Sequence, residues 1–97
     1  MSAYLIYDVD IHDPIPYGEF MKQVKPLVES MGGTYLVRGG ALEVLEGDWN
    51  PTRIVLFEFP DMASARKLFA SEAYAPLKAL RQSCSTGHVV IVEGAKV

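Results

Sequence analysis

Aromatic and aliphatic residues dominate the start of the chain, which is typical of a β-strand. In residues 3–9, "AYLIYDV", the odd-numbered residues form one apolar face and the even-numbered residues form the other. Residues 53–59, "RIVLFEF", and 88–92, "HVVIV", are apolar on both faces, as in strands that are covered on both sides. The pattern therefore predicts a sheet with both of its faces buried.

The apolar period changes to three and four residues from Tyr17 to Met31, which indicates an amphipathic helix. Pro16 suits the first position of this helix, and Gly32 after it suits its end. We expect a bend at Pro26, which removes one backbone hydrogen bond inside the helix.

A second helical segment begins after Asp61, a natural N-cap, and is interrupted at "SEAY", residues 71–74. Pro76 then starts another helical piece. In that piece the pattern turns Leu77, Leu80 and Cys84 inward and predicts an adjacent polar stripe that consists of Tyr74, Lys78 and Arg81.

The Gly39-Gly40 pair separates two apolar runs, 34–38 and 41–46, and its conformation decides whether they form one strand or two. The pair is either a hairpin turn or a bend inside one strand over 34–46. In an antiparallel β-α-β-β-α-β sheet, the first strand lies beside the strand that precedes the second helix. That arrangement needs a single strand over 34–46, so we favour the bend and keep the hairpin as the alternative.

These elements predict one α+β domain over residues 1–97, with a four-stranded antiparallel sheet. Its helices can cover only one face of the sheet, although the strands are apolar on both. We expect a second copy of the chain to cover the other face, as a two-fold homodimer.

Composition excludes several classes of protein. The net charge is −3 and no cluster of Lys or Arg stands out, which argues against nucleic acid as a partner. No stretch reaches the ~20 apolar residues of a membrane helix, and the run from Ala3 to Tyr7 is too short for a signal peptide. With the single cysteine Cys84, we expect a cytoplasmic protein without a membrane partner.

Arg38 is the sharpest candidate for a functional residue. It precedes Gly39 and Gly40, where exposed backbone N–H groups could join its guanidinium in holding a carboxylate or an enolate. The alternative is an arginine at a dimer interface, paired to Glu43 or Glu58.

Other candidates lie in the loops and on the last helical piece. Trp49 and Arg53 flank "NPT" and could contact a flat ligand, although a tryptophan there more often anchors an interface. His12 is a candidate general base at the end of the first strand. Tyr74 and Arg81 share one helical face, and with tyrosines from the strands they could line a pocket between sheet and helices.

No spacing typical of a metal site or of a nucleotide-binding loop is present, so we expect neither a metal nor another cofactor.

Three stretches, "GGTYLVRGG", "EVLEGDWNPTRIVLFEFPDM" and "SEAYAPLKALR", resemble the bacterial family known as domain of unknown function thirteen-thirty. The resemblance covers nearly the whole chain. It implies a ferredoxin-like subunit of the dimeric α/β-barrel superfamily, which includes cofactor-independent monooxygenases and lactone isomerases. The family has no agreed function, so it implies no catalytic residue.

Two hypotheses for function follow. The first is a cofactor-independent enzyme, of oxygenase or isomerase type, that acts on an enolisable or aromatic organic acid. Arg38 would stabilise negative charge, and His12 or a tyrosine such as Tyr74 would move the proton. The second is a non-catalytic dimeric module that binds a small metabolite or a protein partner.

Overall fold

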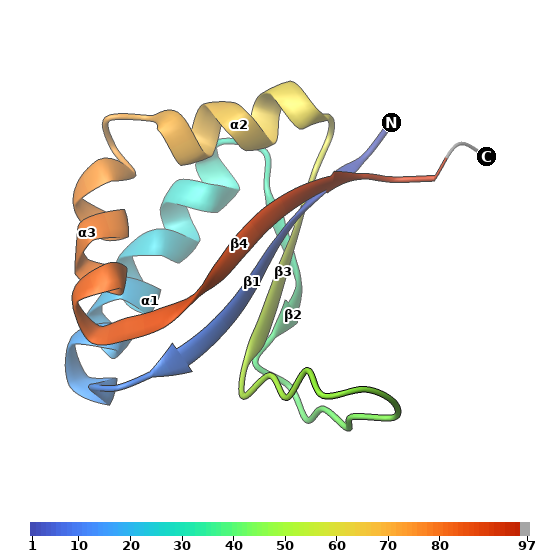
Figure 1. Cartoon of the computed structure of the whole chain (residues 1–97). Coiled ribbons are helices and arrows are strands. Elements are labelled where there is room, and N and C mark those ends of the chain that lie inside the picture. Colours follow the sequence, from blue (N-terminus) through green and yellow to red (C-terminus); the bar gives the residue numbers. More distant parts are fainter. Residues whose placement is uncertain (96–97) are drawn as a thin grey trace.

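A computed structural model describes residues 1–95 of the chain (Figure 1). The elements follow in the order β1 (Ala3–Ile11), α1 (Pro14–Ser30), β2 (Thr34–Arg38), β3 (Ile54–Phe59), α2 (Met62–Ala70), α3 (Ala75–Cys84) and β4 (Ser85–Glu93). The four strands form one antiparallel sheet in the order β2-β3-β1-β4, and the helices cover one of its faces. The predicted α+β class and ferredoxin-like arrangement are confirmed, with the second helical segment divided in two.

The helices begin where capping chemistry favours it. Helix α1 starts at Pro14, two residues before the predicted start, and contains Pro26. A proline costs no hydrogen bond in the first turn, because the N–H groups there have no partner within the helix. Helix α2 is capped by Asp61, whose carboxylate accepts a hydrogen bond from the backbone N–H of Ser64 at 2.7 Å. That contact lowers the pKa of Asp61.

The predicted bent strand over 34–46 is wrong in its extent. Strand β2 ends at Arg38, and residues 40–52, which we call the arm, leave the sheet without regular structure (Figure 1). The hairpin alternative does not form either, since β2 pairs with β3. The inference about direction is confirmed, because β3 runs antiparallel to both β2 and β1.

The register between β2 and β3 contains a β-bulge. Tyr35 lies opposite Phe57, but Val37 lies opposite Leu56 and Arg38 opposite Val55, so Leu36 is the extra residue. The bulge turns Arg38 to the same face of the sheet as Tyr35, whereas plain alternation would place them on opposite faces.

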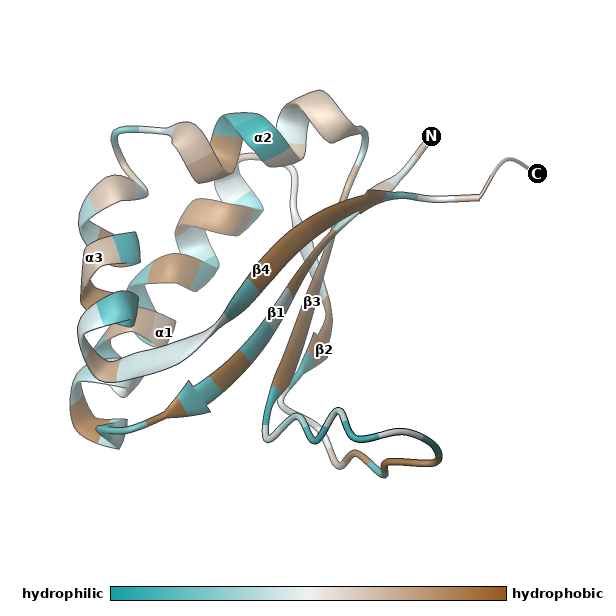
Figure 2. Ribbon diagram, in the orientation of Figure 1, coloured by the Kyte–Doolittle hydropathy of each residue, from teal (hydrophilic) through white to brown (hydrophobic). Residues whose placement is uncertain are grey.

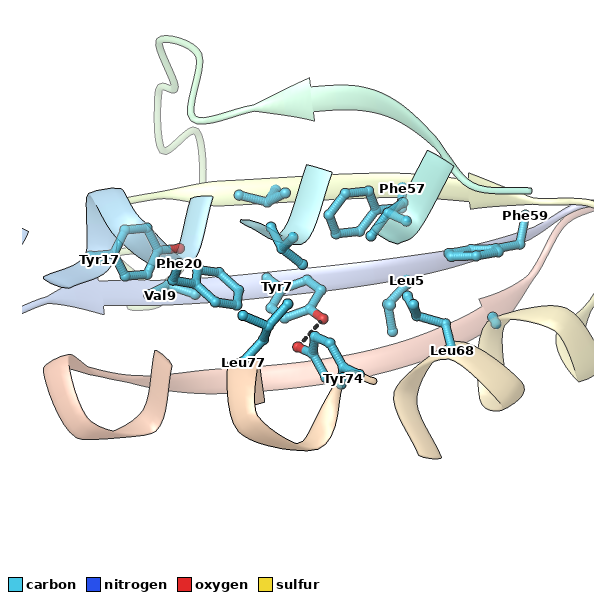
Figure 3. Close-up of a cluster of buried hydrophobic side chains, with 14 of the residues drawn as sticks. Leu5, Tyr7, Val9, Tyr17, Phe20, Phe57, Phe59, Leu68, Tyr74 and Leu77 are labelled. Carbon is cyan, nitrogen blue, oxygen red and sulfur yellow. Dashed lines mark hydrogen bonds between the residues drawn. The ribbon is translucent and has the colours of Figure 1, made fainter. Parts of the chain in front are cut away.

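The two faces of the sheet differ in their cover. The helix-facing side carries the core, with Leu5, Tyr7, Val55, Phe57 and Phe59 nearly inaccessible to water (Figure 3). Figure 2 shows that apolar residues also continue along the strands, and Val90 and Val92 of β4 are exposed on the side without helices. We call this side the open face.

Helix α3 corrects the prediction of a polar stripe. Tyr74, at the start of the helix, is fully buried, and Arg81 is only 5% exposed. Both side chains point into the core instead of water, because Tyr7 of β1 offers a hydroxyl to one and a ring to the other. None of the helices described here has the length and apolar character that crossing a membrane requires.

Candidate ligand-binding site

A recess lies between α1 and the helix-facing side of the sheet. Its polar lining consists of three tyrosines and two arginines, namely Tyr7, Tyr17, Tyr35, Arg38 and Arg53. Apolar side chains of α1 and β3 complete the walls, and the recess holds about 290 Å³ not filled by atoms, part of it open to solvent. The enclosed part of this space is about 10 Å³, room for about one water molecule, so a larger ligand binds here only if the lining side chains move apart.

Arg38 reaches the recess because of the bulge in β2. Its side chain is exposed, and its Cζ lies 5.0 Å from the centre of the Tyr35 ring, within cation–π distance. Burial raises the pKa of Tyr35, and the charge of Arg38 opposes that shift. Within residues 1–95, no ion pair joins Arg38 to Glu43 or Glu58, and Glu58 lies on the open face, where it accepts a hydrogen bond from Tyr4.

Arg53 is held more tightly at the same end of the recess. Its Nη2 lies 3.3 Å from the sulfur of Met21, and its Cζ lies 5.9 Å from the Tyr17 ring centre. Its Nε is buried without a hydrogen-bond partner. The guanidinium rests against Gly39, where a Cβ would lie 2.5 Å from Cζ of Arg53. The absence of a side chain at Gly39 therefore allows the turn after β2 and also leaves space for the Arg53 guanidinium.

The two arginines of the recess have no acidic partner among residues 1–95. The ion pairs within residues 1–95 join His12 to Asp10, Lys22 to Glu19 and His88 to Asp8, and none involves an arginine. Cations next to aromatic rings and without a carboxylate favour an anion in the space between them.

The tyrosines of the recess are hydrogen-bond donors and not bases. Burial raises the pKa of Tyr7 and Tyr17 above the ordinary value for a phenol, so both stay protonated at neutral pH. Neither a carboxylate nor an imidazole is among the residues that line the recess. The site can therefore stabilise negative charge, but it offers no evident group to remove a proton.

Tyr74 and Arg81 lie behind the recess, on the far side of Tyr7. The hydroxyls of Tyr7 and Tyr74 are 2.7 Å apart in a buried hydrogen bond (Figure 3). Cζ of Arg81 lies 5.2 Å from the centre of the Tyr7 ring. Tyr74 and Arg81 thus both contact Tyr7, which also lines the recess.

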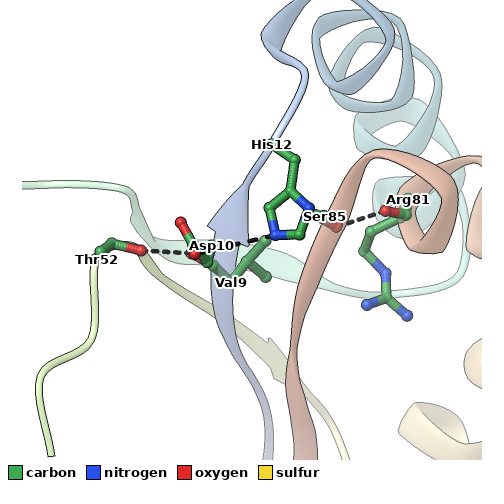
Figure 4. Close-up of polar contacts among 6 residues, drawn as sticks. All are labelled: Val9, Asp10, His12, Thr52, Arg81 and Ser85. Carbon is green, nitrogen blue, oxygen red and sulfur yellow. Dashed lines mark hydrogen bonds and ion pairs between the residues drawn. The ribbon is translucent and has the colours of Figure 1, made fainter.

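Three other candidates lie away from the recess. His12 is exposed at the end of β1, with Nε2 4.0 Å from Oδ2 of Asp10 (Figure 4). Trp49 belongs to the arm and donates from Nε1 to Oδ2 of Asp8 at 2.8 Å, on the open face. Gly40 is an exposed residue of the arm with no neighbour at its Cβ position.

The sequence carried a signal for the position of Arg53 in the recess, but none for that of Tyr17. Arg53 is two residues before Val55 and four before Phe57, so strand alternation could have placed it on their face of the sheet and apart from Trp49. Tyr17 lies in the predicted apolar stripe of α1. Helical periodicity does not show that this side chain lines a recess together with two arginines.

Comparison with known proteins gives a family and a fold. A family model described as "Domain of unknown function (DUF1330)" matches residues 2–95. No protein of curated function matches the chain.

Among solved structures, a protein of unknown function from Rhodopseudomonas palustris superimposes with a TM-score of 0.76 at 14% identity, over 99% of this chain and 84% of that chain. SnoaB, a cofactor-independent oxygenase from Streptomyces nogalater, gives a TM-score of 0.71 at 14% identity, over 99% and 95% of the two chains. An antibiotic biosynthesis monooxygenase gives 0.53 at 19% identity, over 99% and 100%. These similarities show that the subunit shares its fold with those proteins.

Proposed function

We propose that this chain, which belongs to the family described as domain of unknown function (DUF1330), binds a small, flat organic acid in the recess between α1 and the sheet. The observation that carries the proposal is the position of Arg38 and Arg53, at the recess and without an acidic partner in the described part of the chain. Their guanidinium groups bind the carboxylate, and the aromatic walls contact the body of the ligand.

The chemistry of the recess suits a ligand that ionises easily. Because the lining tyrosines stay protonated and no carboxylate or imidazole lines the space, the protein stabilises an anion that the ligand forms by itself. An acidic enol or phenol meets this requirement. The reaction is then either relocation of the proton or oxygenation by O₂, with the electrons supplied by the ionised substrate. The fold shared with SnoaB supports the oxygenase class by analogy alone.

A non-catalytic binding module is the second candidate, and the same absence of a base from the recess lining favours it. The two functions differ in turnover. An enzyme consumes an enolisable acid such as phenylpyruvate in air, and a module binds it unchanged.

The test is a binding titration with benzoate, followed by the backbone amide NMR signals of α1 and β3. We expect Arg38→Ala and Arg53→Ala each to weaken binding about tenfold, since a hydrogen bond to a charged group contributes about 1.5–3 kcal/mol. The control is Arg66→Ala, which removes the same charge from the exposed surface of α2. Equal affinity in all three variants would show that the recess is not an anion site.

A further inference from the structure

The cluster behind the recess contains buried donors without acceptors. Arg81 is 5% exposed, and its Nε has no hydrogen-bond partner. No ion pair within residues 1–95 includes it. A buried N–H without an acceptor is costly, because it has lost water, and the guanidinium packs against the Tyr7 ring, which offers that N–H no oxygen acceptor.

The tyrosine pair adds a second unused donor. Two phenol hydroxyls carry two hydrogens, and the bond of 2.7 Å between Tyr7 and Tyr74 uses one of them. The remaining hydrogen has no acceptor in the described part of the chain, because neither hydroxyl has a further partner there. Native interiors leave few donors unpaired, so two neighbouring ones require an explanation.

An oxygen with negative charge would satisfy both donors together. A guanidinium and a phenol O–H are the donor types that hold oxyanions in low-dielectric sites. The nearby hydroxyl of Ser85 donates to the backbone carbonyl of Arg81, and no hydrogen bond joins it to the Arg81 guanidinium in the described part of the chain (Figure 4).

We propose that Arg81, Tyr7 and Tyr74 form an inner oxyanion site, which binds an ionised enol or phenol oxygen of the ligand. The inference rests on the proposed function for the carboxylate, which binds in the recess between Arg38 and Arg53, whereas the inner cluster lies on the other side of Tyr7. Tyr7 connects the two, because it lines the recess and its hydroxyl belongs to the inner cluster. The substrate class narrows to flat acids that carry a carboxylate at one end and an ionisable hydroxyl at the other.

The probe for the inner site is 4-nitrophenol, which has no carboxylate and turns yellow when it ionises. Titration of the bound probe with pH reports directly whether the protein prefers the phenolate. We expect the whole chain to bind the phenolate at least tenfold more tightly than the phenol, so that bound probe ionises about one pH unit below free probe.

Arg81→Met removes the charge and keeps the length of the side chain. We expect it to abolish the preference for phenolate and to leave benzoate affinity within twofold of the unmodified chain. Arg53→Ala should do the reverse, with benzoate binding weakened and the phenolate preference kept. This crossed design separates the inner site from the carboxylate site. If benzoate does not bind but phenolate is still preferred, only the proposed function is lost.

Tyr7→Phe is the second variant, and it decides the matter if Arg81→Met does not fold. It removes one donor without changing charge, and we expect it to reduce the phenolate preference several-fold. The proposal is overturned if unmodified protein binds the probe as the phenol or does not bind it. It is also overturned if phenolate preference survives both variants. In each case a buried water would be sufficient to pair Arg81 and the tyrosines.

Discussion

At the scale of the residue, the Tyr7 hydroxyl lies 2.7 Å from that of Tyr74, and both rings are shielded from water. Burial raises the pKa of Tyr7 far above that of the unfolded chain. Above pH ~10 the unfolded chain loses this proton and the folded chain keeps it. The contribution of Tyr7 to the free energy of unfolding is therefore independent of pH below pH ~10. Above pH ~10 it falls by up to ~1.4 kcal/mol per pH unit.

We predict that Tyr7→Phe makes the alkaline loss of stability shallower, as measured by urea unfolding between pH 8 and pH 11. At neutral pH the same variant should cost about 1–3 kcal/mol, because it leaves the Tyr74 hydroxyl buried without its partner. The double variant Tyr7→Phe with Tyr74→Phe is the control, since removing both hydroxyls should recover part of that loss. A single variant as stable as the unmodified chain at pH 7 contradicts the pairing.

At the scale of the element, the end of β2 sets the position of Arg53. Gly39 has φ of +68°, a left-handed conformation, and its N–H donates to the carbonyl of Ile54 at 2.9 Å. Its missing Cβ also leaves the space that the Arg53 guanidinium fills. We predict that Gly39→Ala lowers the free energy of unfolding by about 1–2 kcal/mol from backbone strain. It should also weaken benzoate binding, because Arg53 is displaced from the recess.

The neighbouring glycine provides the matched control for this substitution. Gly40 has no positive φ, and in the described part of the chain no atom lies within 4 Å of the position that a Cβ would take, so Gly40→Ala should change neither property measurably. Thermal unfolding and the benzoate titration, carried out on both variants, separate the two glycines. Equal effects from the two substitutions would mean that the arm, and not the contact with Arg53, determines the result.

Elements whose pattern is local were predictable from the sequence, and elements that depend on pairing were not. The alternation of β1 and the proline and aspartate at the helix starts identified those elements and their order. Residues 41–46 are also rich in apolar residues, yet they form no strand, because no strand among residues 1–95 pairs with them. A strand needs a partner as well as a pattern.

The candidate site follows the same rule. The bulge at Leu36, which brings Arg38 to the face of Tyr35, arises in the register with β3 and has no mark in the local sequence. Arg81 was predicted on a polar stripe, because helical periodicity cannot show that Tyr7 lies opposite this side chain. Residue type and spacing therefore identified the arginines, and tertiary pairing decided which of them share a recess.

At the scale of the whole molecule, the subunit is a two-layer structure that lacks a third layer. Its Cα atoms extend 36 × 35 × 17 Å, and its helices cover only one face of the sheet (Figure 1). Its accessible surface is 6119 Å², and a compact monomer of this mass exposes about 5,500 Å². The arm adds Leu42, Val44, Leu45 and Trp49 to the exposed apolar side chains.

One row of apolar residues crosses the open face through all four strands. Val37 lies opposite Leu56, Leu56 opposite Ile6, and Ile6 opposite Val90. A continuous apolar row of this kind, beside the exposed apolar residues of the arm, is typical of an interface and not of a free surface. We therefore expect the open face to pack against that of a second copy, related by a two-fold axis.

Val90→Asp tests the dimer without disturbing the core. Val90 is 55% exposed in the single chain, so a carboxylate there stays in water if the subunit is a monomer and is buried without a partner if two sheets meet. We predict a dimer for the unmodified chain in light scattering at micromolar concentration, and an increase in its dissociation constant of about 30-fold or more for Val90→Asp. Ile15→Asp is the control, because Ile15 is 80% exposed on α1, on the helix side of the sheet. It should leave the dimer intact, and a monomeric unmodified chain, or a dimer that tolerates Val90→Asp, would mean that the open face has another partner.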